Sequence, residues 1–278
     1  MKIKFLKMSG AGNDFIAFDN RKGAIPEEKK SDLAKDLCRR GLSIGSDGIL
    51  LIEPSSHALF IMRVFMPDGS EAETCGNGAR CIALLARKLK IAPRNMSFET
   101  RAGVYQAEVR GDHVKLSMTD PHDLRINILI QESDVPVSEV HFINTGVPHV
   151  VLFVKDLDHV DVATIGRRIR RLPEFQPAGT NVNFVELRDK NHMRIRTYER
   201  GVEDETLACG TGCIASAMVA AHFGHVKSPV HLKTKSGIVN TVHFTPGQGL
   251  PTNIKLEGEA RIVLEGRIEI DPGNPLTI

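Results

Sequence analysis

The sequence predicts an α+β protein made of two pseudo-symmetric domains, each a curled, mostly antiparallel, β-barrel-like sheet around a central buried helix. Segments typical of strands dominate the chain, and two further segments have helical character but almost no charge. A helix that is apolar all round has to be buried on all sides. In a strand-rich chain of 278 residues, which is long enough for two domains, only sheet can cover two such helices.

Strand signals run through the whole chain. In 193–198, polar and apolar residues alternate, which indicates a strand with one buried face. Turn sequences such as Pro67-Asp68-Gly69 separate neighbouring strands. The predicted strands are 59–65, 104–109, 114–118, 150–154, 182–187, 193–198, 230–233, 238–244, 254–256 and 260–264.

Two helices with a polar face are also expected. One covers 26–40, where a proline precedes the first turn and Leu33 and Leu37 share one face. Cys38 lies beside that face and is therefore expected in the core. The other covers 162–171 and carries a run of arginines, which we interpret as a solvated face.

The two apolar helices each begin at a Cys-Gly-x-Gly element. The segment 75–86 contains a single charged residue, Arg80, and the segment 209–221 contains none. Cys81 and Cys213 lie deeper in these helices and are expected to pack in the cores.

The cysteines that open these helices are the strongest functional signal. A cysteine at a helix start lies beside unpaired backbone N–H groups and the positive end of the helix dipole, which favours the thiolate. The adjoining glycines let a ligand approach the backbone, and the same N–H groups suit a carboxylate. Cys75 and Cys209 are therefore predicted to act as a pair of thiol acid/bases facing one bound acid.

The two halves also share an order of features. A strand, a Gly-containing turn and a glutamate precede Cys75, and the same series precedes Cys209, which suggests an ancient duplication. We expect the domain join near residue 121. The predicted domains are 1–121, with a last strand at about 268–278 returning to it, and 122–267.

Composition narrows the class of partner and compartment. A net charge of +2 gives no reason to expect nucleic acid as a partner. Five cysteines in so long a chain form no disulfide framework, and their spacings make no paired zinc site, so we expect free thiols, no metal and a cytoplasmic protein. The first residues alternate charged and apolar side chains unlike a signal peptide, and no apolar run is long enough to span a bilayer, so no membrane is expected.

Several further motifs, taken in order, resemble those of the diaminopimelate epimerase family. The resemblance covers nearly the whole chain, and its specificity comes from the series rather than from any single motif. The motifs are Lys7-Met8-Ser9-Gly10-Ala11-Gly12-Asn13-Asp14-Phe15, Gly45-Ser46-Asp47-Gly48, Asp68-Gly69-Ser70-Glu71, Cys75-Gly76-Asn77-Gly78-Ala79-Arg80-Cys81, Asn144-Thr145-Gly146-Val147-Pro148-His149, Tyr198-Glu199-Arg200-Gly201 and Cys209-Gly210-Thr211-Gly212.

The resemblance implies an enzyme that interconverts LL- and meso-diaminopimelate in lysine and cell-wall precursor supply, as a homodimer without cofactor or metal. Removing a proton from one face of Cα and delivering one to the other calls for two groups on opposite faces. The family assigns these catalytic roles to Cys75 and Cys209, supported by His149 and Glu199. The residues expected to bind the substrate are Asn13, Gly76, Asn77, Asn181, Glu199, Arg200, Gly210 and Thr211.

Three positions depart from the family pattern. Met66 and Val147 stand where members carry asparagines that contact the distal end of the substrate, and Gly48 replaces a glutamine of some members. A cofactor-independent racemase of another amino acid, such as proline, is therefore the alternative. A thiol redox or ligand-binding protein is a third hypothesis, against which the two separate, glycine-flanked helix starts argue, since a redox pair is more often Cys-x-x-Cys.

Overall fold

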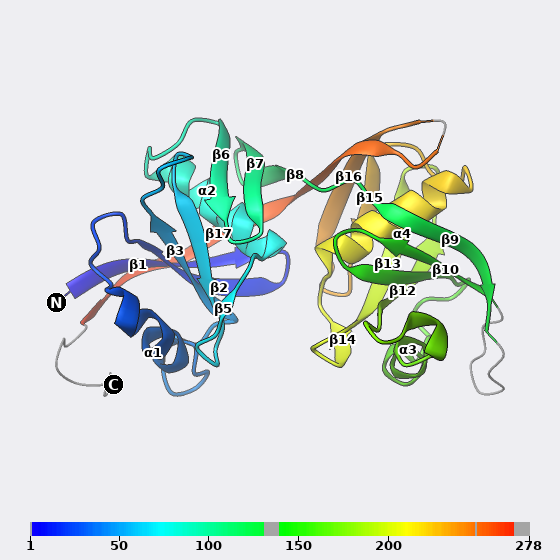
Figure 1. The fold of residues 1–278 in the computed structure, drawn as a ribbon, viewed down its shortest axis with the longest axis horizontal. Coiled ribbons are helices and arrows are strands. Elements are labelled where there is room, and N and C mark those ends of the chain that lie inside the picture. Colours follow the sequence, from blue (N-terminus) through cyan, green and yellow to red (C-terminus); the bar gives the residue numbers. More distant parts are fainter. Residues whose placement is uncertain (1, 131–138, 248, 270–278) are drawn as a thin grey trace. The chain divides into compact units, whose positions relative to one another are not determined.

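The structure of the chain, a computed structural model, describes residues 2–130, 139–247 and 249–269 (Figure 1). It divides into two compact units, Met1–Leu116 with Gly258–Ile278, and Ser117–Glu257. Both units are rich in strands and each contains one buried helix, so the predicted fold class is confirmed.

The first unit is a closed ring of strands around helix α2 (Gly76–Lys88). Helix α2 contacts β1, β2, β3, β4 and β7, and its residues 77–86 are all buried. Helix α1 (Glu27–Leu37) connects β2 to its parallel neighbour β3 and contacts β3 and β4. The ring runs in the order β17–β1–β2–β3–β4–β6–β7–β8 and back to β17. Its strands are β1 (Lys2–Gly10), β2 (Asn13–Asp19), β3 (Gly48–Glu53), β4 (Ile61–Phe65), β6 (Asn95–Thr100), β7 (Gly103–Arg110), β8 (His113–Ser117) and β17 (Thr252–Glu269), with the short β5 (Glu71–Ala72) beside β4.

The second unit repeats this plan around helix α4 (Gly210–His222). Helix α4 contacts β10, β11, β12 and β16, and helix α3 (Val162–Arg170) connects the parallel strands β11 and β12. A backbone hydrogen bond also runs from Met118, the residue after β8, to Ile254 of β17. The order is β9–β10–β11–β12–β13–β15–β16–β17. The strands are β9 (His122–Leu129), β10 (Glu139–Asn144), β11 (Pro148–Phe153), β12 (Asn181–Leu187), β13 (His192–Glu199), β15 (Val230–Lys233) and β16 (Val239–Thr245), with the short β14 (Asp204–Thr206) beside β13; a short 3-10 helix, η1, covers Pro173–Phe175.

The repeat extends to strand direction. In the first unit β2–β3 and β4–β6 are parallel, and in the second unit β11–β12 and β13–β15 are parallel. The other pairs of known register are antiparallel, such as β3–β4 and β12–β13. The same series of a crossover helix, a short strand and a buried helix therefore occurs twice, as a duplication would produce.

The end of the chain differs from the prediction. The segments 254–256 and 260–264, predicted as two strands, belong to the single strand β17, because alternating burial continues through Gly258. Its first part belongs to the second unit and the rest to the first. The return to the first unit thus begins at Gly258 rather than at 268, and the first crossing falls at 116/117 rather than 121/122. Residues 270–278 of the expected returning strand lie outside the described residues.

Candidate active site

Both cysteines of the Cys-Gly-x-Gly elements are helix N-caps, as the sequence predicts. The Sγ of Cys75 accepts a hydrogen bond from the Gly78 amide at 3.5 Å, and the Sγ of Cys209 accepts one from the Gly212 amide at 3.4 Å. Each thiol therefore caps a buried helix at its positive end. The amides of the first two residues after each cysteine have no acceptor within their own helix and are available to an anion. These residues are Gly76 and Asn77 in α2, and Gly210 and Thr211 in α4.

The two thiols differ in their surroundings. Cys75 is partly exposed, whereas Cys209 is buried. Burial raises the pKa of Cys209 to about 12, and the negative charge of Glu199 acts in the same direction. The Thr211 hydroxyl and the Gly212 amide oppose this shift without overcoming it. At Cys209, burial thus opposes the effect expected of a helix start and favours the protonated thiol.

The remaining cysteines have the core positions expected of them. Cys38, Cys81 and Cys213 are buried free thiols. Burial raises the pKa of Cys81 to about 12, which makes it unreactive.

Asn13 lies beside the start of α2. It follows the hairpin turn between β1 and β2, where Ala11 and Gly12 have φ values of 50° and 100°, as a tight hairpin requires. The Asn77 side-chain amide donates to Asn13 Oδ1 at 2.6 Å, and Asn13 in turn donates to Asp47 at 2.9 Å. Of the predicted ligands in the first unit, Asn13, Gly76 and Asn77 are thus brought together with Cys75.

A charged cluster that the sequence prediction missed supports Asn13. Asp14 forms ion pairs with Lys7 and Arg40, both at 2.5 Å, and Arg40 also contacts Asp47 at 2.7 Å. Burial favours the neutral acid at Asp14, but these two cations hold its pKa below the ordinary value. The cluster fixes Asp47, which holds Asn13.

His149 is completely buried in β11. Its Nδ1 lies 3.1 Å from the side-chain nitrogen of Asn183, so Nδ1 accepts and the ring proton resides on Nε2. Within the described chain, Nε2 has no hydrogen-bond partner. Burial, with the positive charge of Arg200, lowers the pKa of His149 to about 3 and keeps the ring neutral.

Asn183 connects this histidine to the helix that carries the thiol, and the sequence prediction missed it. Its side chain also donates to the Val150 carbonyl at 2.8 Å and accepts from the Thr197 hydroxyl at 3.0 Å. A Cβ at Gly212 would lie 2.4 Å from Asn183 Oδ1, so Asn183 packs against the first turn of α4. The available signal was an asparagine in the otherwise apolar run 182–185.

The other predicted residues of the second unit lie around His149. Asn181 pairs with His149 across the β11–β12 ladder, accepts from the Arg200 amide at 2.9 Å and donates to the Pro148 carbonyl at 3.0 Å. The Arg200 guanidinium donates to the Ala178 carbonyl at 2.8 Å. Burial raises the pKa of Glu199, whose charge acts on Cys209. The structure thus gathers Asn181, Glu199 and Arg200 with His149 and Cys209.

The three positions that depart from the family pattern lie in turns or at a closely packed strand. Met66 is an exposed residue in the turn after β4, and Val147 lies in the β10–β11 hairpin. At Gly48 a Cβ would lie 2.8 Å from the Phe65 carbonyl oxygen, so the backbone here has no room for a longer side chain.

Several solved structures share this fold at low sequence identity. A phenazine biosynthesis protein of the PhzF family from Bacillus anthracis matches with a TM-score of 0.75 and 18% identity, covering 97% of this chain and 100% of that one. A probable proline racemase from Agrobacterium radiobacter K84 matches with a TM-score of 0.69 and 17% identity, covering 99% and 95%. These likenesses define the fold.

Sequence comparison defines the family. The profile of the family described as diaminopimelate epimerase matches residues 5–124 and 141–263. Proteins named diaminopimelate epimerase from Methanocella arvoryzae and Aquifex aeolicus are 42% and 40% identical, covering 97% and 96% of this chain and 98% of each relative. The chain belongs to the diaminopimelate epimerase family and is an epimerase, that is, an isomerase. Among the described residues, no helix is long and apolar enough to cross a membrane.

Proposed function

We propose that this protein interconverts LL- and meso-diaminopimelate without pyridoxal phosphate, using Cys75 and Cys209 as the acid/base pair. One observation carries the proposal. The two units place a thiol in the same way at the N-terminus of a buried helix, each beside two amides suited to a carboxylate. Family membership supplies the substrate, since relatives about 40% identical over nearly their full length bear that name.

The chemistry needs the two thiols in opposite protonation states. The Cys209 thiol, with a pKa of about 12, enters as the acid, and Cys75 enters as the thiolate base. Cys75 takes the α-proton from one face of Cα while Cys209 delivers its own proton to the other face. The roles are then reversed for the opposite stereoisomer. The proposal requires the two units to bring these sulfurs to opposite faces of one carbon.

The charges of the substrate fit the second unit. The α-ammonium pairs with Glu199 and neutralises the charge that raises the Cys209 pKa, which eases the return of that thiol to the thiolate. The amides of Gly76, Asn77, Gly210 and Thr211 stabilise the negative charge that develops on the α-carboxylate.

The remaining polar residues hold the rest of the substrate. We assign Asn13 to the reacting end, His149 to the tuning of the thiols, and Asn181 with Arg200 to the distal end. An arginine suits a distal carboxylate because its planar fork binds both oxygens. Backbone carbonyls or other side chains replace the asparagines missing at Met66 and Val147.

Compartment, assembly and pathway complete the proposal. All five cysteines are free, which fits the reducing cytoplasm. We also propose a homodimer that needs no cofactor and acts in lysine and cell-wall precursor biosynthesis, on the strength of family membership.

The alternative is a racemase of another amino acid on the same scaffold. It is favoured by Met66 and Val147, and by the fold shared with a probable proline racemase and a hydroxyproline epimerase. Arg200 and Asn181 favour diaminopimelate, because proline has no distal carboxylate to bind.

Incubation in D2O with single amino acids and no pyridoxal phosphate tests the proposal. We expect α-deuterium uptake and epimerisation with LL-diaminopimelate and none with L-proline. Exchange with another amino acid alone would establish the alternative, and no exchange under reducing conditions would leave a thiol redox or binding role. Cys75→Ala and Cys209→Ala should each lose at least about 10³-fold in kcat while remaining folded by circular dichroism. Retained activity in either variant would remove that cysteine from the mechanism.

A further inference from the structure

Each predicted catalytic cysteine is the last residue of a short segment that starts at a glutamate. We call the segments 71–75 and 205–209 the arms of the first and second unit. Glu71 of β5 precedes Cys75, and Glu205 of β14 precedes Cys209, in both cases by four residues. The strands in these arms are only two and three residues long. So few ladder hydrogen bonds leave most of the arm's restraint to side chains.

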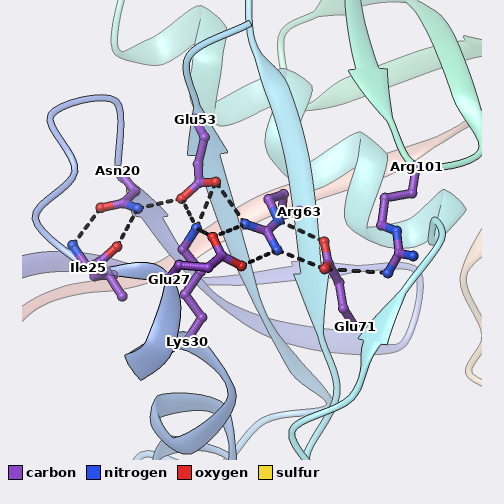
Figure 2. A network of polar contacts seen from close by, with 8 residues as sticks. All are labelled: Asn20, Ile25, Glu27, Lys30, Glu53, Arg63, Glu71 and Arg101. Carbon is purple, nitrogen blue, oxygen red and sulfur yellow. Dashed lines mark hydrogen bonds and ion pairs between the residues drawn. The ribbon is translucent and has the colours of Figure 1, made fainter.

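In the first unit an arginine of the neighbouring long strand grips this glutamate. Arg63 of β4 donates from Nε and Nη2 to the two oxygens of Glu71 at 2.7 and 2.8 Å (Figure 2). Both side chains are only 16% exposed. A bidentate, largely buried pair fixes the direction as well as the distance of the two side chains.

The second unit contains the same pair. Arg196 of β13 donates from Nε and Nη2 to the two oxygens of Glu205 at 2.7 and 2.9 Å. The Glu205 side chain is 8% exposed. Since β13 and β14 occupy the places that β4 and β5 have in the first unit, the pair is part of the repeat.

The surroundings of the two pairs are repeated as well. Arg63 also donates to Glu27, the first residue of α1, and Arg196 donates to the Leu157 and Val160 carbonyls just before α3. Each arginine therefore ties a long strand, the arm and the crossover segment together.

A second cation reaches each glutamate from the loop after the next parallel strand. Arg101, after β6, lies 3.4 Å from Glu71 (Figure 2), and Lys235, after β15, lies 2.7 Å from Glu205. Both units thus carry an arginine and a second cation on the glutamate of the equivalent arm.

We propose that Arg63–Glu71 and Arg196–Glu205 are positioning pairs, each of which fixes the arm that delivers the thiol of its own unit. Neither pair includes a residue that we assign to catalysis or substrate binding. The expected effect of these pairs on kcat rests on the proposed function, because it assumes that Cys75 and Cys209 carry the reaction. The expected effect on where each thiol is held does not depend on that function.

The test compares Arg63→Gln and Arg196→Gln with two matched controls. Arg194→Gln lies on the same strand as Arg196 and removes ion pairs to Asp158 and Glu186, which are not part of the arm. Arg94→Gln removes an exposed ion pair to Glu108 in the first unit.

Alkylation by iodoacetamide, read for each cysteine by peptide mass spectrometry, reports the position of the thiols without any substrate. Arg63→Gln should raise the alkylation rate of Cys75 at least about threefold and leave Cys209 unchanged, and Arg196→Gln should do the reverse. With the active substrate, kcat should fall about 10- to 100-fold at nearly unchanged KM, since displacement of a reacting group by about 1 Å has effects of that size. The controls should change neither quantity.

Arg63 binds several carboxylates, so Glu71→Gln serves as a second variant that keeps the size of the side chain and leaves Arg63 paired with Glu27. The same shift at Cys75 is expected. If Arg63→Gln and Glu71→Gln fold and match Arg94→Gln in both readouts, the arms are positioned without these pairs and the inference is wrong. A wild-type protein inactive on every amino acid would overturn the proposed function, while the alkylation pattern would still decide the positional claim.

Discussion

At the scale of single residues, each of the two helix-capping thiols accepts a hydrogen bond from one backbone amide of its helix, but the two differ in exposure to solvent. Cys209 is buried and faces the charge of Glu199, and both effects raise its pKa. One backbone amide at 3.4 Å is too little to offset them. Because its pKa is raised to about 12, Cys209 is a protonated thiol at pH 7.

This difference predicts how the two cysteines react. Without substrate at pH 7, iodoacetamide should modify the partly exposed Cys75 faster than Cys209. In Glu199→Gln the Cys209 pKa falls, because a negative neighbour is removed, so its alkylation should become at least about threefold faster. Peptide mass spectrometry at timed intervals measures both rates. Slower Cys209 alkylation in Glu199→Gln would show that Glu199 acts as a base toward this thiol instead.

His149 should make the folded protein sensitive to acid. Its pKa is about 3 when folded and about 6.5 when unfolded, so below pH 6.5 the unfolded chain binds a proton that the folded chain does not. The contribution of neutral His149 to the free energy of unfolding is thus fully present above pH 6.5 and is lost progressively as the pH falls toward 3. Between pH 7 and pH 5 this residue alone should remove about 2 kcal/mol from the free energy of unfolding.

Urea unfolding of wild type and His149→Gln at the two pH values measures that contribution. The variant should lose about 2 kcal/mol less than wild type over this interval. His113→Gln, at an exposed position, is the control and should follow wild type. An unchanged pH dependence in His149→Gln would mean that the buried ring accepts a proton at ordinary pH.

At the scale of elements, close packing of helix α3 on β13 places a strict demand on one glycine. A Cβ at Gly166 would lie 2.4 Å from Tyr198 Cβ, a fully buried residue next to Glu199. Gly166→Ala should therefore force α3 away from the strand and cost about 1–3 kcal/mol of stability, despite the better helix propensity of alanine. Urea denaturation measures the loss.

The exposed Thr164 of the same helix supplies the control for this prediction. Thr164→Ser should change stability by no more than about 0.5 kcal/mol. A Gly166→Ala variant as stable as wild type would show that α3 shifts on the sheet at no cost.

Helices and strands with a clear hydrophobic pattern or with turn residues at their ends could be predicted from the sequence. Elements without these signals could not. The buried helices were evident from their lack of charge, and β12, β13 and β15 from their composition and bounding turns. Strand β3 is a nearly continuous apolar run, which periodicity cannot separate from a buried helix. Strand β9 is mostly exposed and shows no period, while β5 and β14 are too short to give one.

The same limit applies to the candidate site. Cys75, Cys209 and His149 stand in local motifs, so they could be proposed as site residues from the sequence. Asn183 and the Arg63–Glu71 pair act through partners on other strands, and such partners become neighbours only when the sheet is formed.

At the scale of the whole molecule, the chain builds the same unit twice and joins the two copies at two points. The chain passes from the first unit to the second after Leu116 and returns within β17, at Gly258. Neither unit contains both thiols, since Cys75 belongs to the first and Cys209 to the second. The proposed reaction, with two thiols on opposite faces of one carbon, would therefore require one cysteine from each unit.

The origin of the proton in the earliest product tests this central claim most directly. The protein is mixed with LL-diaminopimelate in D2O, and product and remaining substrate are separated within the first few per cent of conversion. Two thiols on opposite faces predict one α-deuterium in every product molecule and almost none in the remaining substrate, because the abstracted proton stays on the thiol of the departure face. Product that keeps the original protium would show that a single group carries the proton across and would contradict the account.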